Sequence, residues 1–303
     1  MPRAAIDVGS NSVKLVLADD LATPLLDRVA VTGLGEGLGR TGRLAEPAMA
    51  RTLDALAALV AEARARGAGD FAAVGTAALR AAANADEFCA RARARCGIAI
   101  AVIPGEEEAR LAFLAARSGA GAPAGPCLVV DIGGGSTEFI FGKGKGEGDA
   151  MGERFSLPLG CLRATEEFQR SDPAPPAVLA AMATAFAAAL APLAPGAGAL
   201  IGIGGTFSSL GTVALGAPDW DPRRVEGLEL SRAEVERQLA LYQRLRIAER
   251  AALPGLMPER APVILAGAAI ALAVMRRRGA ERLRLSSRAL RHGLWLARWG
   301  RSA

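Results

Sequence analysis

The chain has 303 residues, of which 51% are hydrophobic, 22% charged and 4% aromatic, and its formal net charge is +5. A length that suggests about two domains, with ordinary globular composition, excludes a mini-protein, a coiled coil and a disordered tail, and the charge permits a polyanionic partner without requiring one. Four cysteines without a C-x-x-C pair, and a single histidine, exclude a structural zinc site and indicate a reducing, cytoplasmic location.

The chain opens on a predicted β-hairpin. Residues 4–17, AAIDVGSNSVKLVL, consist of an apolar run, an Asp, a short polar turn and a second apolar run. This order is typical of two strands joined by a tight turn. Ser10, Asn11 and Ser12 would offer backbone N–H groups and polar side chains to a phosphate, and Asp7 at the strand end suits Mg²⁺.

Strands and helices are predicted to alternate after this hairpin, which indicates an α/β fold with ligands at strand ends. The expected strands are 25–32, 70–75 and 98–103, and the expected helices are 46–66, 79–96 and 106–117, with a Gly-rich loop at 33–43. A Gly/Ala/Pro-rich segment at 118–126 is the best candidate for a linker.

Three glutamates begin the helix expected at 106–117. Glu106, Glu107 and Glu108 complement the helix dipole as an acidic first turn. They point at different angles, so one of them can face a cleft while the others face water. Because crowded like charges raise the pKa of one member, that residue would suit a general base. The helical pattern alone leaves open which of the three it is.

The opening hairpin is repeated further along the chain. Residues 128–141, LVVDIGGGSTEFIF, align with it so that Asp7 meets Asp131 and Lys14 meets Glu138. This separation is too long for a solenoid repeat and indicates a duplicated α/β domain. The glycines that follow Asp131 form a second candidate phosphate cradle, and Asp131 is a second candidate Mg²⁺ ligand.

A third Gly-rich turn, Gly204-Gly205-Thr206, lies between an apolar strand and an expected helix. The apolar run 261–275 is too short to span a membrane and predicts a buried helix. His292 lies in an Arg-rich helical tail, so acid–base chemistry is left to carboxylates. Other expected elements are helices at 179–191 and 231–246, strands at 155–157 and 283–285, and a polar turn at 143–149.

Two arginine clusters, residues 91, 93 and 95 and residues 276–278, have alternative interpretations. Arg alternating with Ala is typical of a solvated helix face, and the alternative is a path for a polyanion. Specific nucleic-acid recognition lacks a motif and the aromatic residues on which bases stack. Trp220, Trp295 and Trp299 are expected to be packing residues.

These features together resemble the exopolyphosphatase/guanosine pentaphosphate phosphohydrolase (Ppx/GppA) family, within the actin, Hsp70 and sugar-kinase superfamily. The resemblance rests on motifs in family order across nearly the whole chain: AIDVGSNSVKL from Ala5, VGTAALRAAANADEF from Val74, IPGEEEARLAF from Ile103, VVDIGGGSTEF from Val129, LPLGCLRATEEF from Leu157, IGIGGTFSSLG from Ile201 and LPGLMPERAPVILAGAAI from Leu253.

The resemblance implies two similar ribonuclease-H-like (actin-like ATPase) α/β domains, with mixed sheets flanked by helices and the active site in the interdomain cleft. The expected domains are 1–124 and 125–303, with the last helix, about 288–303, packing back on the first domain. The chain resembles the short form of the family, for which no HD-like domain and a preference for shorter polyphosphates are expected.

The resemblance also implies roles for individual residues. Glu108 matches the catalytic base, which resolves the choice among the three glutamates, and Asp131 and Glu138 match carboxylates that organise metal and water. With Asp7, they form the expected metal-binding set. The expected phosphate- and substrate-binding residues are Ser10, Asn11, Ser12, Arg80, Asn84, Gly133, Gly134, Gly135, Ser136, Gly204, Gly205 and Thr206.

The implied activity is Mg²⁺-dependent release of terminal orthophosphate from inorganic polyphosphate. The alternatives are hydrolysis of pppGpp to ppGpp in the stringent response, a polyphosphate or nucleotide sensor with little turnover, and an acceptor-dependent kinase. Mn²⁺ is the alternative divalent ion, and a monovalent cation such as K⁺ is compatible. A homodimer is expected, without a membrane or specific nucleic-acid partner. Ser287 stands where an acidic residue is usual and Ala289 where Gly is common, so the contribution of this segment stays open.

Overall fold

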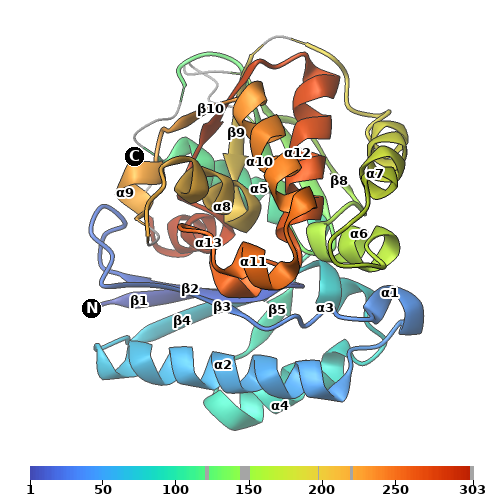
Figure 1. The fold of residues 1–303 in the computed structure, drawn as a ribbon. Coiled ribbons are helices and arrows are strands. Elements are labelled where there is room, and N and C mark those ends of the chain that lie inside the picture. Colours follow the sequence, from blue (N-terminus) through green and yellow to red (C-terminus); the bar gives the residue numbers. More distant parts are fainter. Residues whose placement is uncertain (120–122, 144–150, 197, 219–220, 301–303) are drawn as a thin grey trace. The chain divides into compact units, whose positions relative to one another are not determined.

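The chain forms two compact units in the computed structural model, which describes residues 1–119, 123–143, 151–196, 198–218 and 221–300 (Figure 1). The first unit comprises Met1–Ala115 with Leu290–Ala303, and the second comprises Ala116–Ala289. The first division falls ahead of the 124/125 boundary expected from the sequence. Trp220 and the expected turn at 143–149, apart from Lys143, lie outside the described residues.

The first unit is built on a mixed five-stranded sheet of order β3-β2-β1-β4-β5. The first three strands are antiparallel neighbours, whereas β4 and β5 continue the sheet parallel to β1. The predicted opening hairpin is confirmed, with Asp7 paired to Lys14 across β1 and β2. The strands are β1 (Arg3–Val8), β2 (Ser12–Ala18), β3 (Leu26–Val31), β4 (Asp70–Gly75) and β5 (Ile100–Val102).

Apolar side chains cover both faces of this sheet, because alternate residues of a strand point to opposite sides. Ile6 and its alternate neighbours join the core formed with α2 (Glu46–Ala65) and α4 (Ala85–Cys96), which lie together against one face in Figure 1. Ala5 belongs to the opposite cluster, with Trp295. The strand that carries Asp7 is therefore buried on both sides.

Two expectations for the first unit are wrong in detail. The single helix expected at 79–96 is broken into α3 (Ala77–Ala81) and α4, and the loop expected at 33–43 contains the short helix α1 (Leu38–Thr41). The break between α3 and α4 has a tertiary cause. The Asn84 side chain accepts a hydrogen bond from the Leu44 backbone N–H at 2.8 Å and donates one to the Leu44 carbonyl at 3.1 Å.

The C-terminal helix α13 (Leu290–Trp299) packs on β1, β2 and β4 of the first unit. Arg291 donates two hydrogen bonds to Asp27, at 2.7 and 3.0 Å, and His292 Nε2 lies 3.2 Å from the same carboxylate. Burial alone would raise the pKa of Asp27, but Arg291 and His292 outweigh it and hold this pKa well below its usual range. The only histidine is thus buried beside Asp27.

Gly293 permits the close approach of α13 to α5 (Gly105–Arg117), because a Cβ at this position would overlap the Leu111 carbonyl. We expect Gly293→Ala to lower the stability of the protein by about 1–3 kcal/mol or more, since backbone atoms yield less readily than a flexible side chain. Urea denaturation measures the loss. Gly39→Ala, which meets no atom within 4 Å, is the control, and equal midpoints for the two variants would contradict this packing.

The second unit is built on a mixed six-stranded sheet of order β10-β11-β9-β6-β7-β8. The second predicted hairpin is confirmed, with Asp131 paired to Glu138, while β9 and β11 continue parallel to β6. The strand expected at 155–157 extends further toward the N-terminus. The strands are β6 (Cys127–Ile132), β7 (Thr137–Gly142), β8 (Met151–Leu157), β9 (Ala199–Ile203), β10 (Glu229–Ser231) and β11 (Arg282–Leu285).

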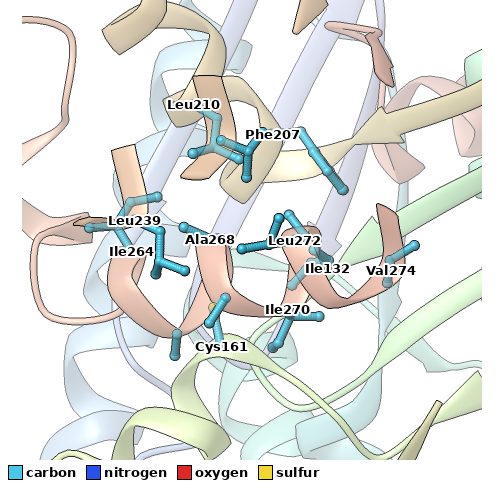
Figure 2. Packing of buried hydrophobic residues seen from close by; sticks show 14 of the residues in the cluster. Ile132, Cys161, Phe207, Leu210, Leu239, Ile264, Ala268, Ile270, Leu272 and Val274 are labelled. Atoms are coloured by element: carbon cyan, nitrogen blue, oxygen red, sulfur yellow. The ribbon is translucent and has the colours of Figure 1, made fainter. Parts of the chain in front are cut away.

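The core of the second unit surrounds α12 (Ile264–Arg278), which is buried along nearly its whole length. Figure 2 shows Ile264, Ala268 and Leu272 of this helix among side chains from neighbouring elements, including Phe207 and Leu210. The buried helix predicted from the apolar run is therefore confirmed, and no helix in the described ranges is long and apolar enough to cross a membrane. The other helical segments are α6 (Cys161–Phe168), α7 (Pro176–Ala189), α8 (Gly204–Ala214), α9 (Pro222–Val225), α10 (Arg232–Arg244), α11 (Ile247–Ala251) and the 3₁₀ turn η1 (Pro258–Arg260).

The two arginine clusters have local partners. Arg91 pairs with Glu46 and Arg95 with Asp54, joining α4 to α2. Arg276 pairs with Glu236, and Arg277 donates to backbone carbonyls after α7. These contacts give the clusters structural roles and do not support the alternative of a polyanion path.

Candidate active site

Backbone N–H groups within residues 32–35 form hydrogen bonds with the turn of the first hairpin. Gly35 N–H donates to the Ser10 carbonyl at 2.8 Å, and Thr32 and Gly33 N–H donate to the Asn11 carbonyl at 2.9 and 3.1 Å. With these carbonyls occupied, the conformation of the turn is fixed. Ser10, Asn11 and Ser12 are each buried, so their positions are set before any ligand arrives.

Two polar atoms of this hairpin are buried without a hydrogen-bond partner in the described part of the chain: Asp7 Oδ1 and Asn11 Nδ2. The other oxygen of Asp7 accepts from Lys14 Nζ at 2.7 Å. Buried polar atoms are nearly always paired in native proteins, so unpaired ones point to a ligand. An acceptor suits a cation or its water, and an amide donor suits a phosphate oxygen.

Glu108 is the buried member of the three glutamates that open α5. Its carboxylate lies 2.6 Å from Arg80 Nη1, whereas Glu107 pairs with Arg110 on the exposed side of the helix. Glu106 is exposed. Burial raises the pKa of Glu108 above its ordinary value, and Arg80 opposes part of that rise. A buried carboxylate with a raised pKa is suited to accept a proton near neutral pH.

The second hairpin places two carboxylates on neighbouring strands. Asp131 of β6 pairs in register with Glu138 of β7, where the first hairpin has Asp7 and Lys14. Glu138 is 1% exposed, and its Oε1 accepts from Ser156 Oγ at 2.9 Å. The duplicated framework therefore presents a charge-balanced pair in the first unit and an acidic pair in the second.

The N-terminus of α6 fixes the Gly-rich turn of the second hairpin. Cys161 N–H donates to the Gly133 carbonyl at 2.9 Å, and Leu162 N–H donates to the Gly134 carbonyl at 3.0 Å. The helix thereby uses N–H groups that lack partners within the helix, and these bonds hold the loop's carbonyls. Gly135 and Ser136 complete the turn, and Ser136 is buried.

The third Gly-rich turn lies beside the second one. Gly204 has a positive φ of 83°, and a Cβ there would overlap Asp131 Oδ1, so glycine is required by conformation and by space. Thr206 Oγ1 lies 3.4 Å from the Ile132 carbonyl. The structure therefore brings the expected residues of the second and third turns together around Asp131.

Arg260 is a candidate that the sequence reasoning missed. Its buried guanidinium lies against Gly205, where a Cβ would overlap it. The residue belongs to the segment LPGLMPERAP. The one clue to it in this segment is a charged residue directly before an apolar helix. Cys161 is close by, but burial raises the pKa of its thiol, which makes it a poor nucleophile at neutral pH.

Asn84 and Ser287 occupy different settings from those the sequence suggested. The Asn84 amide is engaged with both backbone polar groups of Leu44, so its position is structural. Ser287 donates from its backbone and its hydroxyl to Glu226, each at 2.8 Å, and Ser286 Oγ donates to the same carboxylate. Glu226 thus supplies a negative charge where the residue at 287 is not acidic.

The carboxylates present fit Mg²⁺ better than a metal that needs a complete protein cage. Among the described residues no group of three or more His, Cys, Asp or Glu could enclose a metal ion. Mg²⁺ keeps several waters and takes about one or two protein carboxylates together with substrate phosphates. In the second unit, the Asp131–Glu138 pair matches that number of protein carboxylates. In the first unit, the unpaired oxygen of Asp7 offers one carboxylate contact.

Comparison with known proteins identifies the family. The profile of the Ppx/GppA phosphatase family matches residues 14–301. The chain belongs to the Ppx/GppA phosphatase family. As a Ppx/GppA protein it is a phosphoanhydride hydrolase. The expected fold, with two actin-like domains of mixed sheets flanked by helices, is also confirmed.

Individual Ppx/GppA relatives align over almost the whole chain. Exopolyphosphatase 1 of Mycobacterium tuberculosis is 32% identical, and the match covers 98% of this chain and 88% of that protein. Guanosine-5′-triphosphate,3′-diphosphate pyrophosphatase of Photobacterium profundum is 33% identical, over 96% of this chain but 58% of that protein. The crystal structure of an Aquifex aeolicus Ppx/GppA family member superposes with a TM-score of 0.81 at 31% identity, over 98% of this chain and 97% of that one.

Proposed function

We propose that this chain is an exopolyphosphatase that releases terminal orthophosphate from inorganic polyphosphate. The observation that carries the proposal is the buried Glu108 carboxylate, held by Arg80 at 2.6 Å in a protein of the Ppx/GppA family. Polyphosphate carries dense negative charge and no base or sugar to recognise. Backbone turns, an amide and carboxylate-bound cations suffice to bind such a substrate.

In this proposal each residue keeps the role that the family resemblance implies. Asp131 and Glu138, and likewise Asp7, would bind Mg²⁺, which supplies charge neutralisation and orients phosphate oxygens. The Gly133–Ser136 turn and the first-hairpin turn would bind phosphate through N–H groups and side-chain donors. Glu108 would orient a water molecule and accept its proton as the water oxygen attacks the terminal phosphorus. The shortened chain then departs as the leaving group.

Hydrolysis of pppGpp at its 5′ end is the second candidate. It is favoured by the similarity to the Photobacterium profundum pyrophosphatase, but the chain covers only 58% of that protein, against 88% of the Mycobacterium tuberculosis exopolyphosphatase. The chemistry would be the same, since both substrates end in a phosphoanhydride. A role in the stringent response would follow from this second activity.

Phosphate release from polyphosphate, pppGpp and ATP, measured side by side, tests the proposal. We expect the highest kcat/KM with polyphosphate and loss of release when EDTA removes the divalent ion, with recovery on adding Mg²⁺ and a comparison with Mn²⁺. Adding K⁺ to the assay tests whether a monovalent cation increases phosphate release. Preference for pppGpp would favour the second candidate, whereas polyphosphate binding without release would favour a sensor.

We further propose that the protein acts in the cytoplasm as a homodimer. No disulfide joins its four cysteines, all of which lie in the described ranges, and three of them are buried, which is compatible with a reducing compartment. The dimer follows from the family resemblance alone. Analytical ultracentrifugation of the purified protein measures the association state, and a monomer at micromolar concentration would contradict it.

A further inference from the structure

Arg80 lies beside Glu108 and is fixed to the backbone that leads into the helix carrying it. Its Nη1 donates to Glu108 Oε2 at 2.6 Å and to the Ile103 carbonyl at 3.0 Å. Ile103 is followed by Pro104, and α5 begins at Gly105. One guanidinium nitrogen therefore joins the carboxylate to the start of its own helix.

The neighbouring ion pair of α5 shows how different this setting is. Glu107 and Arg110 also form a short pair, but their side chains are 36% and 44% exposed, whereas those of Glu108 and Arg80 are 11% and 24% exposed. Exposed pairs contribute little because water competes for both partners. Water competes less for the partners of the buried pair.

We propose that Arg80 is a positioning residue for Glu108, which orients the carboxylate and supplies its counter-charge. The sequence assigned Arg80 to the substrate phosphates, whereas the contacts give it a partner within the protein. This inference deepens the proposed function and rests on Glu108 acting as the base there.

The charges around Glu108 support this role. Burial raises the pKa of Glu108, Arg80 of α3 lowers it, Asp7 of β1 raises it and Lys14 of β2 lowers it. Glu106 and Glu107 are further carboxylates in the first turn of its own helix. Without Arg80, Lys14 would be the remaining cation among these groups, so the pKa of Glu108 would rise further. Glu108 must be ionised to act as a base. Without Arg80, the acidic limb of the pH–activity profile would therefore lie at a higher pH than in the wild-type enzyme.

Arg80→Gln and Arg80→Lys test the proposal through the pH profile of kcat/KM. For Arg80→Gln we expect a lower kcat and an acidic limb shifted upward by about one pH unit or more, since a nearby opposite charge lowers a carboxyl pKa by about 1–3 units. Arg80→Lys retains the positive charge, so its acidic limb should lie closer to that of the wild-type enzyme than the limb of Arg80→Gln does. Arg110→Gln, which removes the exposed partner of Glu107, is the matched control and should leave the profile unchanged.

A residue that only binds phosphate would give a different result. Arg80→Gln would then raise KM and leave the acidic limb in place, which would overturn the proposal. If Arg80→Gln fails to fold by circular dichroism, Arg80→Lys still tests the limb. In a folded Arg80→Lys variant, a raised KM with kcat and the acidic limb both unchanged would likewise overturn it.

Carbon-13 NMR of the glutamate carboxyl groups separates this inference from the proposed function. The Glu108 resonance is assigned as the one lost in Glu108→Gln, and its titration is followed in the wild-type protein and the Arg80 variants. A higher Glu108 pKa in Arg80→Gln supports the pairing even if no substrate is hydrolysed. Equal titration in all three proteins overturns it, whatever the wild-type enzyme acts upon.

Discussion

Replacing Glu108 with Gln is expected to lower kcat for phosphate release by roughly 10²–10⁴-fold, the range that a positioned general base contributes. Gln keeps the size of the side chain and an oxygen that can accept the hydrogen bond from Arg80, but it cannot take a proton from water. The expected loss is therefore in kcat, with little change in KM. Steady-state phosphate release from polyphosphate measures both constants.

Glu107→Gln is the matched control for this experiment. It makes the same chemical change one residue earlier, on the exposed side of α5, where Glu107 contacts Arg110. We expect nearly wild-type turnover from this variant. Equal kcat in Glu108→Gln and the wild-type enzyme would exclude Glu108 as the base, and equal losses in both variants would point to a general effect of charge on the helix.

Gly160→Ala should produce the second large loss of activity. Gly160 precedes α6, and a Cβ at this residue would overlap backbone atoms of Gly134 and Gly135. Its φ of −131° is ordinary for any residue, so the penalty comes from the overlap alone. Relief requires the Gly-rich turn to move, which would displace the N–H groups that we propose bind phosphate. Even a shift of about 1 Å in a catalytic group can cost roughly 10²-fold in rate.

Phosphate release and thermal denaturation, measured together, distinguish a moved turn from an unfolded protein. The overpacking itself is expected to cost about 1–3 kcal/mol of stability, which leaves a folded enzyme to assay. Gly125→Ala is the control in the same unit, because a Cβ there meets no atom within 4 Å. Wild-type kcat in Gly160→Ala would mean that the turn can move without affecting catalysis, which would contradict this prediction.

The two hairpins could be predicted from the sequence almost residue by residue. Each consists of an apolar run, an Asp and a Gly-rich turn, and period-two patterning then fixes the register. The alignment of Asp7 with Asp131, and of Lys14 with Glu138, therefore became two matching cross-strand pairs in the structure. Long-range information was not needed, because each hairpin is local in the chain.

Contacts between distant residues were not predictable in this way. The helix expected at 79–96 breaks where Asn84 bonds to Leu44, a residue 40 positions away, and no local pattern records that partner. Arg80 likewise matched a substrate-binding motif, while its contact with Glu108 depends on where α3 and the start of α5 lie in the fold. Sequence could name these side chains but not their partners.

The surroundings of Ser287 and Arg260 were the hardest to predict from the sequence. Ser287 looked like the loss of an acidic group, yet Glu226 brings a carboxylate to the same place from another part of the chain. Arg260 lies against Gly205 although the chain between them contains several elements. A single sequence shows neither that Glu226 lies at Ser287 nor that Arg260 lies at Gly205, because both contacts arise from tertiary packing.

The division of the chain also bears on the order in which the protein is made. The second unit is continuous, whereas the first needs α13 from beyond residue 289 to cover β1 and to pair Asp27 with Arg291. Domains fold as units while the ribosome is still adding residues. The second unit can therefore complete its core first, whereas the unit that carries Glu108 must wait until α13 has been synthesised before its sheet is fully covered. This interval is when the nascent chain would be most exposed to chaperones and proteases.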